Sequence, residues 1–456
     1  MFTGLKAQLD FTDETITDIL AFDHPLVKLK KIVPWAEINE VYRKSFKNPA
    51  RGNASKTTDL IIGLLLLKHL YKLSYRDLVR QLHENLSFMH FCSISLDEIR
   101  AKRDKQERFI DHSTLVKDAH RLGGRRIRKI VKIFTRALRR EGYITGEYLF
   151  TDTTSLEKNI LYPTEVSLLK RVIEHAEMVI QQVEYKKDMV KSVVIRKANQ
   201  IAKVYYSASK KSQEFLAQVS KKLLSIGQEQ LEKMAEVAGQ CGENLEKAVQ
   251  KVYMQVKSTG VKILKQAEQK LSGQTVSDKI VSYYEPHVRA LPKGKVHKPC
   301  EFGVKLRIDM SGEGYVTNYG VYKGNPNDSS MLRETIEEHV QEYGKEFKGG
   351  AMDRGFADRD QVRELEKKHN LILAIPERQG HGTDLPTKQK KKLYNQRSAI
   401  EAKISEGKRM TGLGLCRYKG WEGDLICAGL SILALNMRKI LRDTAGEVEI
   451  PGFETA

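Results

Sequence analysis

The sequence has few of the residues that hold small extracellular domains together. Only 5 of its 456 residues are cysteine, and these form no CxxC pair or Cys/His cluster with the spacing of a zinc site. An odd number of widely spaced thiols does not suit a disulfide framework. We therefore expect reduced cysteines and a reducing compartment.

Long apolar runs are missing as well. The longest, Leu60 to Leu67, has 8 residues, whereas a membrane-spanning helix needs roughly 20. The first residues lack the basic start and apolar stretch of a signal peptide. No GxxxxGK[ST] phosphate loop occurs. We expect a cytoplasmic protein with no membrane contact and no nucleotide-driven activity.

Positive charge is present in excess. Lys and Arg number 78 against 58 Asp and Glu, which gives a net charge of +20. Such an excess attracts polyanions, and in a large intracellular protein it favours nucleic acid as the partner. Charge alone does not separate an enzyme from a binding protein.

Residues 1–145 are predicted to be helical and basic. An apolar helix over Leu60–Leu70 is followed by a capping box, Ser74–Asp77, that begins a second helix. The two helices could form a helix-turn-helix. Residues 101–145 hold 14 Lys and Arg against 5 Asp and Glu. Their basic face is equally consistent with solvation and with phosphate contacts, for which the candidates are Arg125, Arg128 and Lys129.

The stretch from Thr164 to Glu285 contains no proline, and its apolar residues recur at spacings of three and four. This pattern predicts long amphipathic helices of the coiled-coil type. Two roles are open: an arm that pairs subunits, or a lid on the protein's own core. The apolar positions are Val166, Leu169, Ile173, Ala176, Ile180, Val183, Leu216, Val219, Leu223 and Ile226.

Elsewhere strands and helices alternate, which predicts a mixed α/β sheet covered by helices. A short strand over 146–152 comes first, and a hairpin follows at 304–322. The later elements are a helix over 329–343, a strand over 350–353, a helix over 358–368, a strand over 371–376 and a basic helix over 388–409.

Asp152 and Asp353 each stand at the end of a predicted strand. Strand ends place side chains at the rim of a sheet, where sites in α/β proteins gather. Each Asp taken alone is more simply a turn residue. The basic helix changes this interpretation, because Tyr394, Arg397, Glu401 and Lys408 fall within an arc of roughly 60° on it. An ordinary i,i+4 ion pair would explain only Arg397 and Glu401.

The spacing Tyr-x2-Arg-x3-Glu-x6-Lys resembles the YREK motif of bacterial insertion-sequence transposases, which have a DDE triad and a ribonuclease-H-like fold. Thr151–Thr154 and Asp353–Phe356 resemble the two acidic motifs of this group. The likeness covers most of the chain outside the helical segment. Further similar segments are 60–85, 111–115 and 295–328.

The resemblance implies an α/β ribonuclease-H-like catalytic core over 146–163 and 281–440. It also implies an all-α DNA-binding domain over 1–145, a helical insertion over 164–280 after the first core strand, and a tail over 441–456. Asp152 and Asp353 are 201 residues apart in the chain. That distance departs from a plain core, and the insertion accounts for it.

The activity implied is two-metal cleavage of DNA and transfer of the 3′-OH end to target DNA. Asp152, Asp353 and Glu401 would hold Mg²⁺, for which Mn²⁺ would substitute. The implied partner is double-stranded DNA, bound by a homodimer in the bacterial nucleoid. Residues that would contact DNA are Tyr394, Arg397, Lys408, Lys390, Lys391, Arg409 and Arg417.

Two other interpretations stay open: a non-enzymatic DNA-binding scaffold, and a nuclease that does not join strands. Asp358 and Asp360 look like the start of a surface helix. Trp421 could stack on a displaced base, although packing is the simpler role. Three histidines, His287, His297 and His381, have no metal-ligand spacing.

Overall fold

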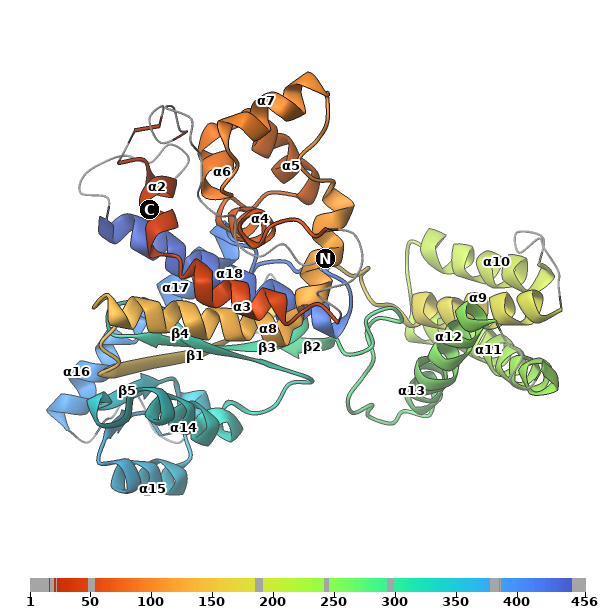
Figure 1. Cartoon of the computed structure of the whole chain (residues 1–456). Helices are drawn as coiled ribbons and strands as arrows, with labels where there is room; N and C mark the ends of the chain where they lie inside the picture. Colours follow the sequence, from red (N-terminus) through yellow and green to blue (C-terminus); the bar gives the residue numbers. More distant parts are fainter. Residues whose placement is uncertain are drawn as a thin grey trace. The chain divides into compact units, whose positions relative to one another are not determined.

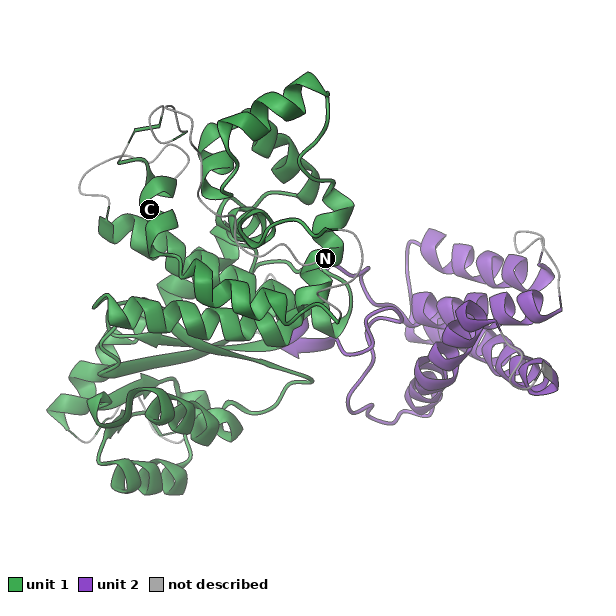
Figure 2. Ribbon diagram, viewed as in Figure 1, with its two compact units in different colours: residues 1–157, 305–456 green, residues 158–304 purple. Residues whose placement is uncertain are grey.

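The chain forms two compact units (Figures 1 and 2). Unit 1 comprises residues 1–157 and 305–456, and unit 2 comprises residues 158–304. The architecture comes from a computed structural model. It describes residues 16, 20, 21, 23–47, 54–184, 192–241, 246–292, 299–377, 385 and 387–444.

The N-terminal part of unit 1 is helical, as predicted. The expected apolar helix is α4, which is buried on nearly all sides. The expected cap of the next helix is confirmed, because Ser74 Oγ accepts a hydrogen bond from the Asp77 amide at 3.1 Å. The helices are α2 (Pro25–Ile32), α3 (Trp35–Arg43), α4 (Thr58–Leu70), α5 (Tyr75–Glu84), α6 (Leu86–Phe91), α7 (Leu96–Asp104) and α8 (His112–Arg140).

Helix α8 carries the basic stretch and bends at Gly123. Its apolar face is buried as the periodicity predicts. Gly123 has a φ of 72°, and the Glu422 carboxylate accepts a hydrogen bond from the next amide, that of Gly124, at 2.6 Å. A Cβ atom on Gly123 would lie 2.7 Å from that carboxylate oxygen. Both the backbone angle and the close approach therefore require glycine.

The final helix, α18 (Gly420–Thr444), is buried along most of its length. It packs against α4, α8 and the strand β4 (Val316–Tyr322). A helix that is buried on all sides joins the elements around it into one core. The N-terminal helices therefore share unit 1 with the sheet, and a functional boundary at residue 145 stays a prediction.

The strands form a mixed sheet in the order β2–β3–β1–β5–β6, with β4 also paired to β3. Strands β1, β5 and β6 run parallel, whereas β3 and β4 form the antiparallel hairpin that the sequence predicts. The strands are β1 (Tyr148–Glu157), β2 (Arg289–Pro292), β3 (Cys300–Ser311), β4, β5 (Gly349–Met352) and β6 (Ile372–Ala374).

Two predicted elements need correction. Strand β1 does not end at Asp152 but continues to Glu157, because β3 pairs along its other edge after β5 has ended. The basic helix is divided at Arg397 into α16 (Lys388–Gln396) and α17 (Ser398–Met410). Periodicity cannot locate such ends, since each depends on a neighbouring element.

Two further helices of unit 1 match the predicted segments, and short 3-10 turns that the sequence did not predict accompany them. They are α14 (Leu332–Tyr343), α15 (Arg359–His369) and the short 3-10 turns η4 (Asp328–Met331), η5 (Gly344–Glu346) and η6 (Arg354–Phe356). Among the described residues, no helix is both long and apolar enough to cross a membrane. The four cysteines whose side chains are described, Cys92, Cys300, Cys416 and Cys427, are free thiols, as expected.

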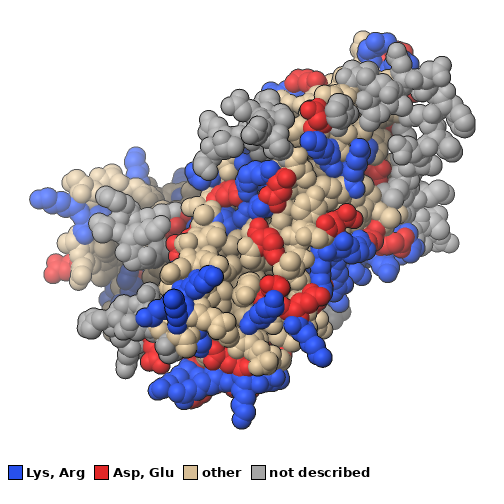
Figure 3. Space-filling view, turned by 90° about the vertical axis from the view of Figure 1, so that its left-hand side faces the viewer, with Lys and Arg blue, Asp and Glu red and all other residues tan. Residues whose placement is uncertain are grey.

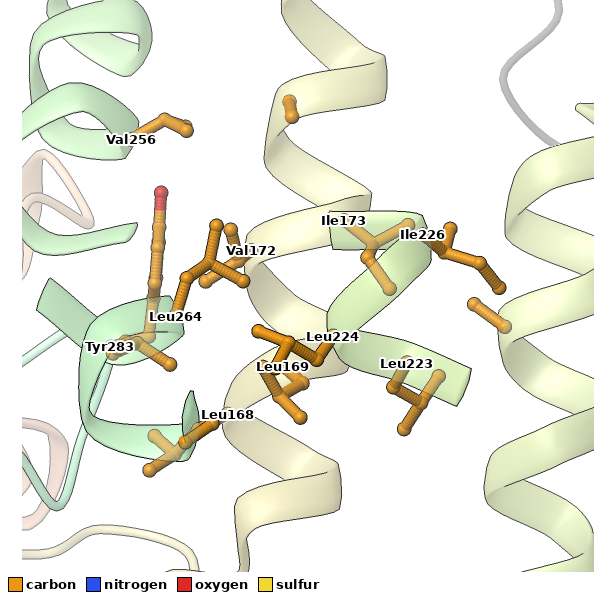
Figure 4. Close-up of a cluster of buried hydrophobic side chains, with 14 of the residues drawn as sticks. Leu168, Leu169, Val172, Ile173, Leu223, Leu224, Ile226, Val256, Leu264 and Tyr283 are labelled. Atoms are coloured by element: carbon orange, nitrogen blue, oxygen red, sulfur yellow. The ribbon is translucent and has the colours of Figure 1, made fainter. Parts of the chain in front are cut away.

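Unit 2 is built from the long helices that the sequence predicts. Its apolar core includes the fully buried side chains of Leu169, Ile173 and Leu223 (Figure 4). Of the ten positions predicted to face inward, only Val183 and Leu216 are partly exposed. The elements are α9 (Glu165–Val183), α10 (Val193–Ser207), α11 (Gln213–Cys241), α12 (Lys247–Gln255), the π-helical turn η3 (Val256–Gly260) and α13 (Val261–Leu271).

Candidate active site

The pairing of β1 with β5 brings two distant acidic residues together. The parallel register runs from Tyr148 opposite Gly349 to Thr151 opposite Met352. The next residue on each side is therefore Asp152 and Asp353. Although 201 residues separate them in the chain, the sheet makes them neighbours.

Both carboxylates lie in a setting that disfavours their charge. The side chain of Asp152 is 17% exposed. Burial, followed by the charge of Asp353, raises the pKa of Asp152 to about 6. Burial, followed by the charge of Asp328, raises the pKa of Asp353 as well. Two adjacent, poorly solvated carboxylates leave negative charge that a cation would balance.

Arg397 connects this pair to the third predicted carboxylate. Its Nη1 lies 3.3 Å from Asp152 Oδ2, and its Nη2 donates to Glu401 Oε1. The guanidinium also lies over the ring of Tyr394, 5.4 Å from the centroid. Three of the four residues of the predicted stripe thus contact one another. Lys408 is half-buried farther along α17.

Glu401 is linked to Asp152 by an ion pair that each makes with Arg397. Its side chain is 56% exposed. Within the described part of the chain, no three His, Cys, Asp or Glu side chains are close enough together to hold one metal ion. In this structure the Arg397 guanidinium lies between the carboxylates of Asp152 and Glu401 and forms an ion pair with each.

A fourth carboxylate, Asp328, lies beside the pair and was assigned no role from sequence. It forms an ion pair with Lys305 Nζ at 2.6 Å and accepts a hydrogen bond from Thr153 Oγ1 at 3.0 Å. The available signal was the resemblance of residues 295–328, which end at Asp328, to the transposase pattern. That signal marked the segment without showing which side chain turns toward Asp353.

The residues predicted to contact DNA differ in whether they already pair with an acidic side chain of the protein. Arg128 is bonded to Glu338 at 2.8 Å, and Lys390 to Glu366 at 2.6 Å. One face of the molecule carries basic and acidic side chains interspersed (Figure 3). The exposed members of the predicted set are Arg125, Lys129, Lys391, Arg409 and Arg417.

The remaining predictions from the sequence concern single residues and the C-terminal tail. Asp358 caps α15 by accepting a hydrogen bond from the Gln361 amide at 3.1 Å, which confirms its structural role. His287 lies 3.8 Å from Glu285. Trp421 has Lys323 over its ring at 5.2 Å. His297, His381 and residues 445–456 of the predicted tail lie outside the described residues.

Comparison with known proteins gives two family matches. Residues 14–118 match a family described as a transposase domain (DUF772), and residues 285–437 match the transposase DDE domain. The second match includes Asp353 and Glu401 but begins after Asp152. The place of Asp152 in the site therefore depends on the strand register.

A curated relative has a similar sequence. It is the uncharacterized protein ORF8 in the nfe locus of Rhizobium meliloti, 30% identical over 159 residues, a match that covers 33% of this chain and 72% of that protein. No solved structure matches. The DDE domain implies a ribonuclease-H-like fold, and the mixed sheet flanked by helices is compatible with it. On these matches, the chain belongs to the DDE transposases of insertion sequences.

Proposed function

We propose that this transposase cleaves DNA at the ends of its element and joins the freed 3′-OH to target DNA at the site formed by Asp152, Asp353 and Glu401. The observation that carries the proposal is the β1–β5 register, which sets Asp152 beside Asp353. The link from Asp152 through Arg397 to Glu401 supports the inclusion of the third carboxylate.

The donor set fits a divalent cation. Carboxylate oxygens are the ligands that Mg²⁺ prefers, and Mn²⁺ accepts the same set. Burial, and after it a neighbouring carboxylate, raises the pKa of both Asp152 and Asp353, and a bound cation would favour their charged forms. When bound, such ions would activate the attacking oxygen and stabilise the leaving one.

The chain's own residues position the DNA. Arg397 presents a planar fork that suits a phosphate beside the scissile bond, and the ring of Tyr394 supports it from one face. Lys408 extends the same stripe. We assign backbone contacts to Lys390, Lys391, Arg409 and Arg417, which fix register without reading sequence.

Alanine substitution of each carboxylate tests the site. Asp152→Ala, Asp353→Ala and Glu401→Ala should each lower the cleavage rate by about 10³-fold or more and leave binding to element ends intact. Combined variants should lose little further activity, because the three act as one unit. Asp360→Ala, an exposed acidic change on α15, is the matched control and should cleave normally.

A readout that does not use activity is Mn²⁺ binding to the DNA-free protein, followed by electron paramagnetic resonance. Asp152→Ala and Asp353→Ala should weaken it strongly, and Asp360→Ala should not. A variant that cleaves at the wild-type rate would remove that residue from the site. With a pre-cleaved end, hydrolysis without strand joining would reduce the proposal to a nuclease.

We assign non-specific DNA affinity in part to the exposed face of α8. Arg125 and Lys129 lie one helical turn apart and are both exposed. The double change to alanine should weaken binding to all sequences and lower the salt-dependence slope by about 2. Arg128→Ala should change binding less and stability more, because Arg128 is bonded to Glu338. An unchanged slope in the double variant would assign the contacts elsewhere.

We further propose that the protein acts as a homodimer on paired ends and that unit 2 is the pairing arm. Residues 164–284 should be replaced by a short flexible linker, so that Leu168 and Tyr283 of its core are removed with it. Light scattering on DNA should then show single-end complexes only. Normal two-end complexes would instead leave unit 2 as a lid or an incidental insertion.

A further inference from the structure

Asp328 bridges the two segments that carry the catalytic pair. It stands at the start of η4, directly after the 324–327 loop. Its Oδ1 accepts a hydrogen bond from Thr153 Oγ1 at 3.0 Å, and Thr153 is the residue after Asp152 on β1. One side of the Asp328 carboxylate is therefore fixed to the strand of the first catalytic residue.

The other side of the same carboxylate lies against the segment that follows Asp353. A Cβ atom built on Gly355 would lie 2.7 Å from Asp328 Oδ2 and 3.0 Å from Asp353 Oδ1. The Gly355 amide also donates to Asp353 Oδ1 at 3.0 Å. Only glycine at position 355 lets both carboxylates approach the backbone this closely.

Lys305 supplies the counterion for Asp328. Its ammonium group lies 2.6 Å from Asp328 Oδ1 and donates to the Pro326 carbonyl oxygen at 2.7 Å. The Lys305 side chain is only 13% exposed. Removing one member of a poorly solvated ion pair leaves an uncompensated charge, so the two residues should act together.

We propose that Asp328 is a positioning residue that fixes Asp152 and Asp353 relative to each other, with Lys305 as its fixed counterion. Its oxygens hold the residue after Asp152 and contact the residue two after Asp353, so it sets the separation of the metal-binding pair. Because Lys305 already balances its charge, Asp328 is assigned to support and not to metal binding. This inference rests on the proposed function.

The test measures Mn²⁺ affinity and cleavage rate for Asp328→Ala, Asp328→Asn, Lys305→Met and the double variant Lys305→Met/Asp328→Asn. Asp328→Ala should raise the Mn²⁺ dissociation constant and lower kcat by about 10- to 100-fold each, the range typical of residues that orient metal ligands. The concentration of DNA that gives half-maximal rate should stay unchanged. Asp360→Asn and Lys367→Met are matched exposed controls on α15.

The conservative variant separates positioning from simple folding. Asp328→Asn keeps an oxygen that can accept from Thr153, so it should recover part of the loss seen with alanine. The double variant should be no worse than Lys305→Met alone, because the two residues form one coupled pair. Thermal unfolding of each variant shows that the measured protein is folded, and Asp328→Asn carries the test should the alanine variant not fold.

Two results would overturn the inference. If folded Asp328→Ala binds Mn²⁺ and cleaves like the wild type while Asp152→Ala does neither, the positioning role fails and the proposed function stands. If Asp328→Asn abolishes Mn²⁺ binding as completely as Asp152→Ala, Asp328 is a metal ligand. Mn²⁺ binding that survives in Asp152→Ala and Asp353→Ala would instead sink the proposed function itself.

Discussion

Unit 2 and the β1–β5 strand pair of unit 1 withdraw different kinds of side chain from solvent. The core of unit 2 consists of aliphatic residues such as Leu169, Ile173 and Leu223, supplied by helices close together in sequence. Where the interior strands β1 and β5 pair, the half-buried Asp152 and Asp353 lie next to each other, with Asp328, Lys305 and Arg397 close by. The aliphatic core of unit 2 stabilises the protein, whereas the β1–β5 pair holds like charges close together.

The difference indicates which region of the fold carries the proposed chemistry. Each fully buried aliphatic side chain contributes about 1.5–3 kcal/mol. Burial, followed by a neighbouring carboxylate, raises the pKa of both Asp152 and Asp353, so their ionised forms oppose folding until a cation binds. A region that keeps such charges despite their cost is a candidate for chemistry. Substitutions in the core of unit 2 should therefore lower stability and leave cleavage unchanged. Substitutions of the carboxylates should lower cleavage without lowering stability.

The largest change in stability is expected in unit 2. Leu169→Ala removes a fully buried side chain and should lower the free energy of unfolding of that unit by about 2–5 kcal/mol. Urea unfolding of the full chain, followed by hydrogen exchange in α9, measures this. Leu161→Ala, at a position that is 76% exposed, is the matched control and should change it by about 0.5 kcal/mol or less.

The same variant also separates the stability of unit 2 from the cleavage activity of unit 1. Single-end cleavage by folded Leu169→Ala should equal that of the wild type, since the proposed catalytic carboxylates lie in unit 1. Equal unfolding midpoints for the two leucine variants would contradict the assignment of a tightly packed core.

A smaller effect is expected for a paired charge in unit 1. Glu406 contacts Lys403, Arg438 and Arg442. Although burial opposes it, the hydrogen bonds and charges of Arg442 and Lys403 lower the pKa of Glu406 to about 2. Because this pKa lies below the unfolded value, the stabilisation is present above about pH 4.5 and is lost as the pH falls toward 2.

Glu406→Gln should therefore destabilise unit 1 by about 1–2 kcal/mol at pH 7, after allowance for solvent screening. Urea midpoints at pH 7, 5 and 3 provide the measurement. The difference from the wild type should shrink steadily between pH 4.5 and pH 3. A difference independent of pH would mean that packing, not charge, is what the substitution removes.

The smallest effect has the opposite sign. In metal-free protein at pH 7, Asp152→Asn should raise the stability of unit 1 by about 1 kcal/mol, because it removes a charge beside Asp353. The folded-state pKa of Asp152, about 6, lies above the unfolded value. Its favourable contribution is therefore present only at low pH and is lost as the pH rises through 6.

The gain from Asp152→Asn should consequently shrink as the pH falls below 6 and vanish below about pH 3, where the wild-type residue is mostly protonated in both states. Adding Mn²⁺ should reverse the order by stabilising only the wild type. Thermal unfolding with and without Mn²⁺ decides between these outcomes. A destabilised Asp152→Asn at pH 7 without metal would show that the bond to Arg397 outweighs repulsion from Asp353.

Local signals predicted most of the elements. The apolar periodicity located α4, the inner face of α8 and the core positions of unit 2, because helical burial follows a fixed spacing. The hairpin β3–β4 and the cap at Ser74 were likewise visible in neighbouring residues. The ends of β1 and the break at Arg397 were not, because partners from elsewhere in the chain determine them.

The same distinction between local and tertiary signals holds for the candidate site. The sequence by itself singled out the candidate residues, since the spacing of Tyr394, Arg397, Glu401 and Lys408 resembles the YREK motif, although the chain there forms two helices that meet at Arg397. Only the tertiary structure decided that Arg397 would contact Asp152 and that Asp328 would join the group. Such contacts depend on strand register and on chain segments far apart in sequence, and a one-residue shift in register would turn Asp152 to the opposite face.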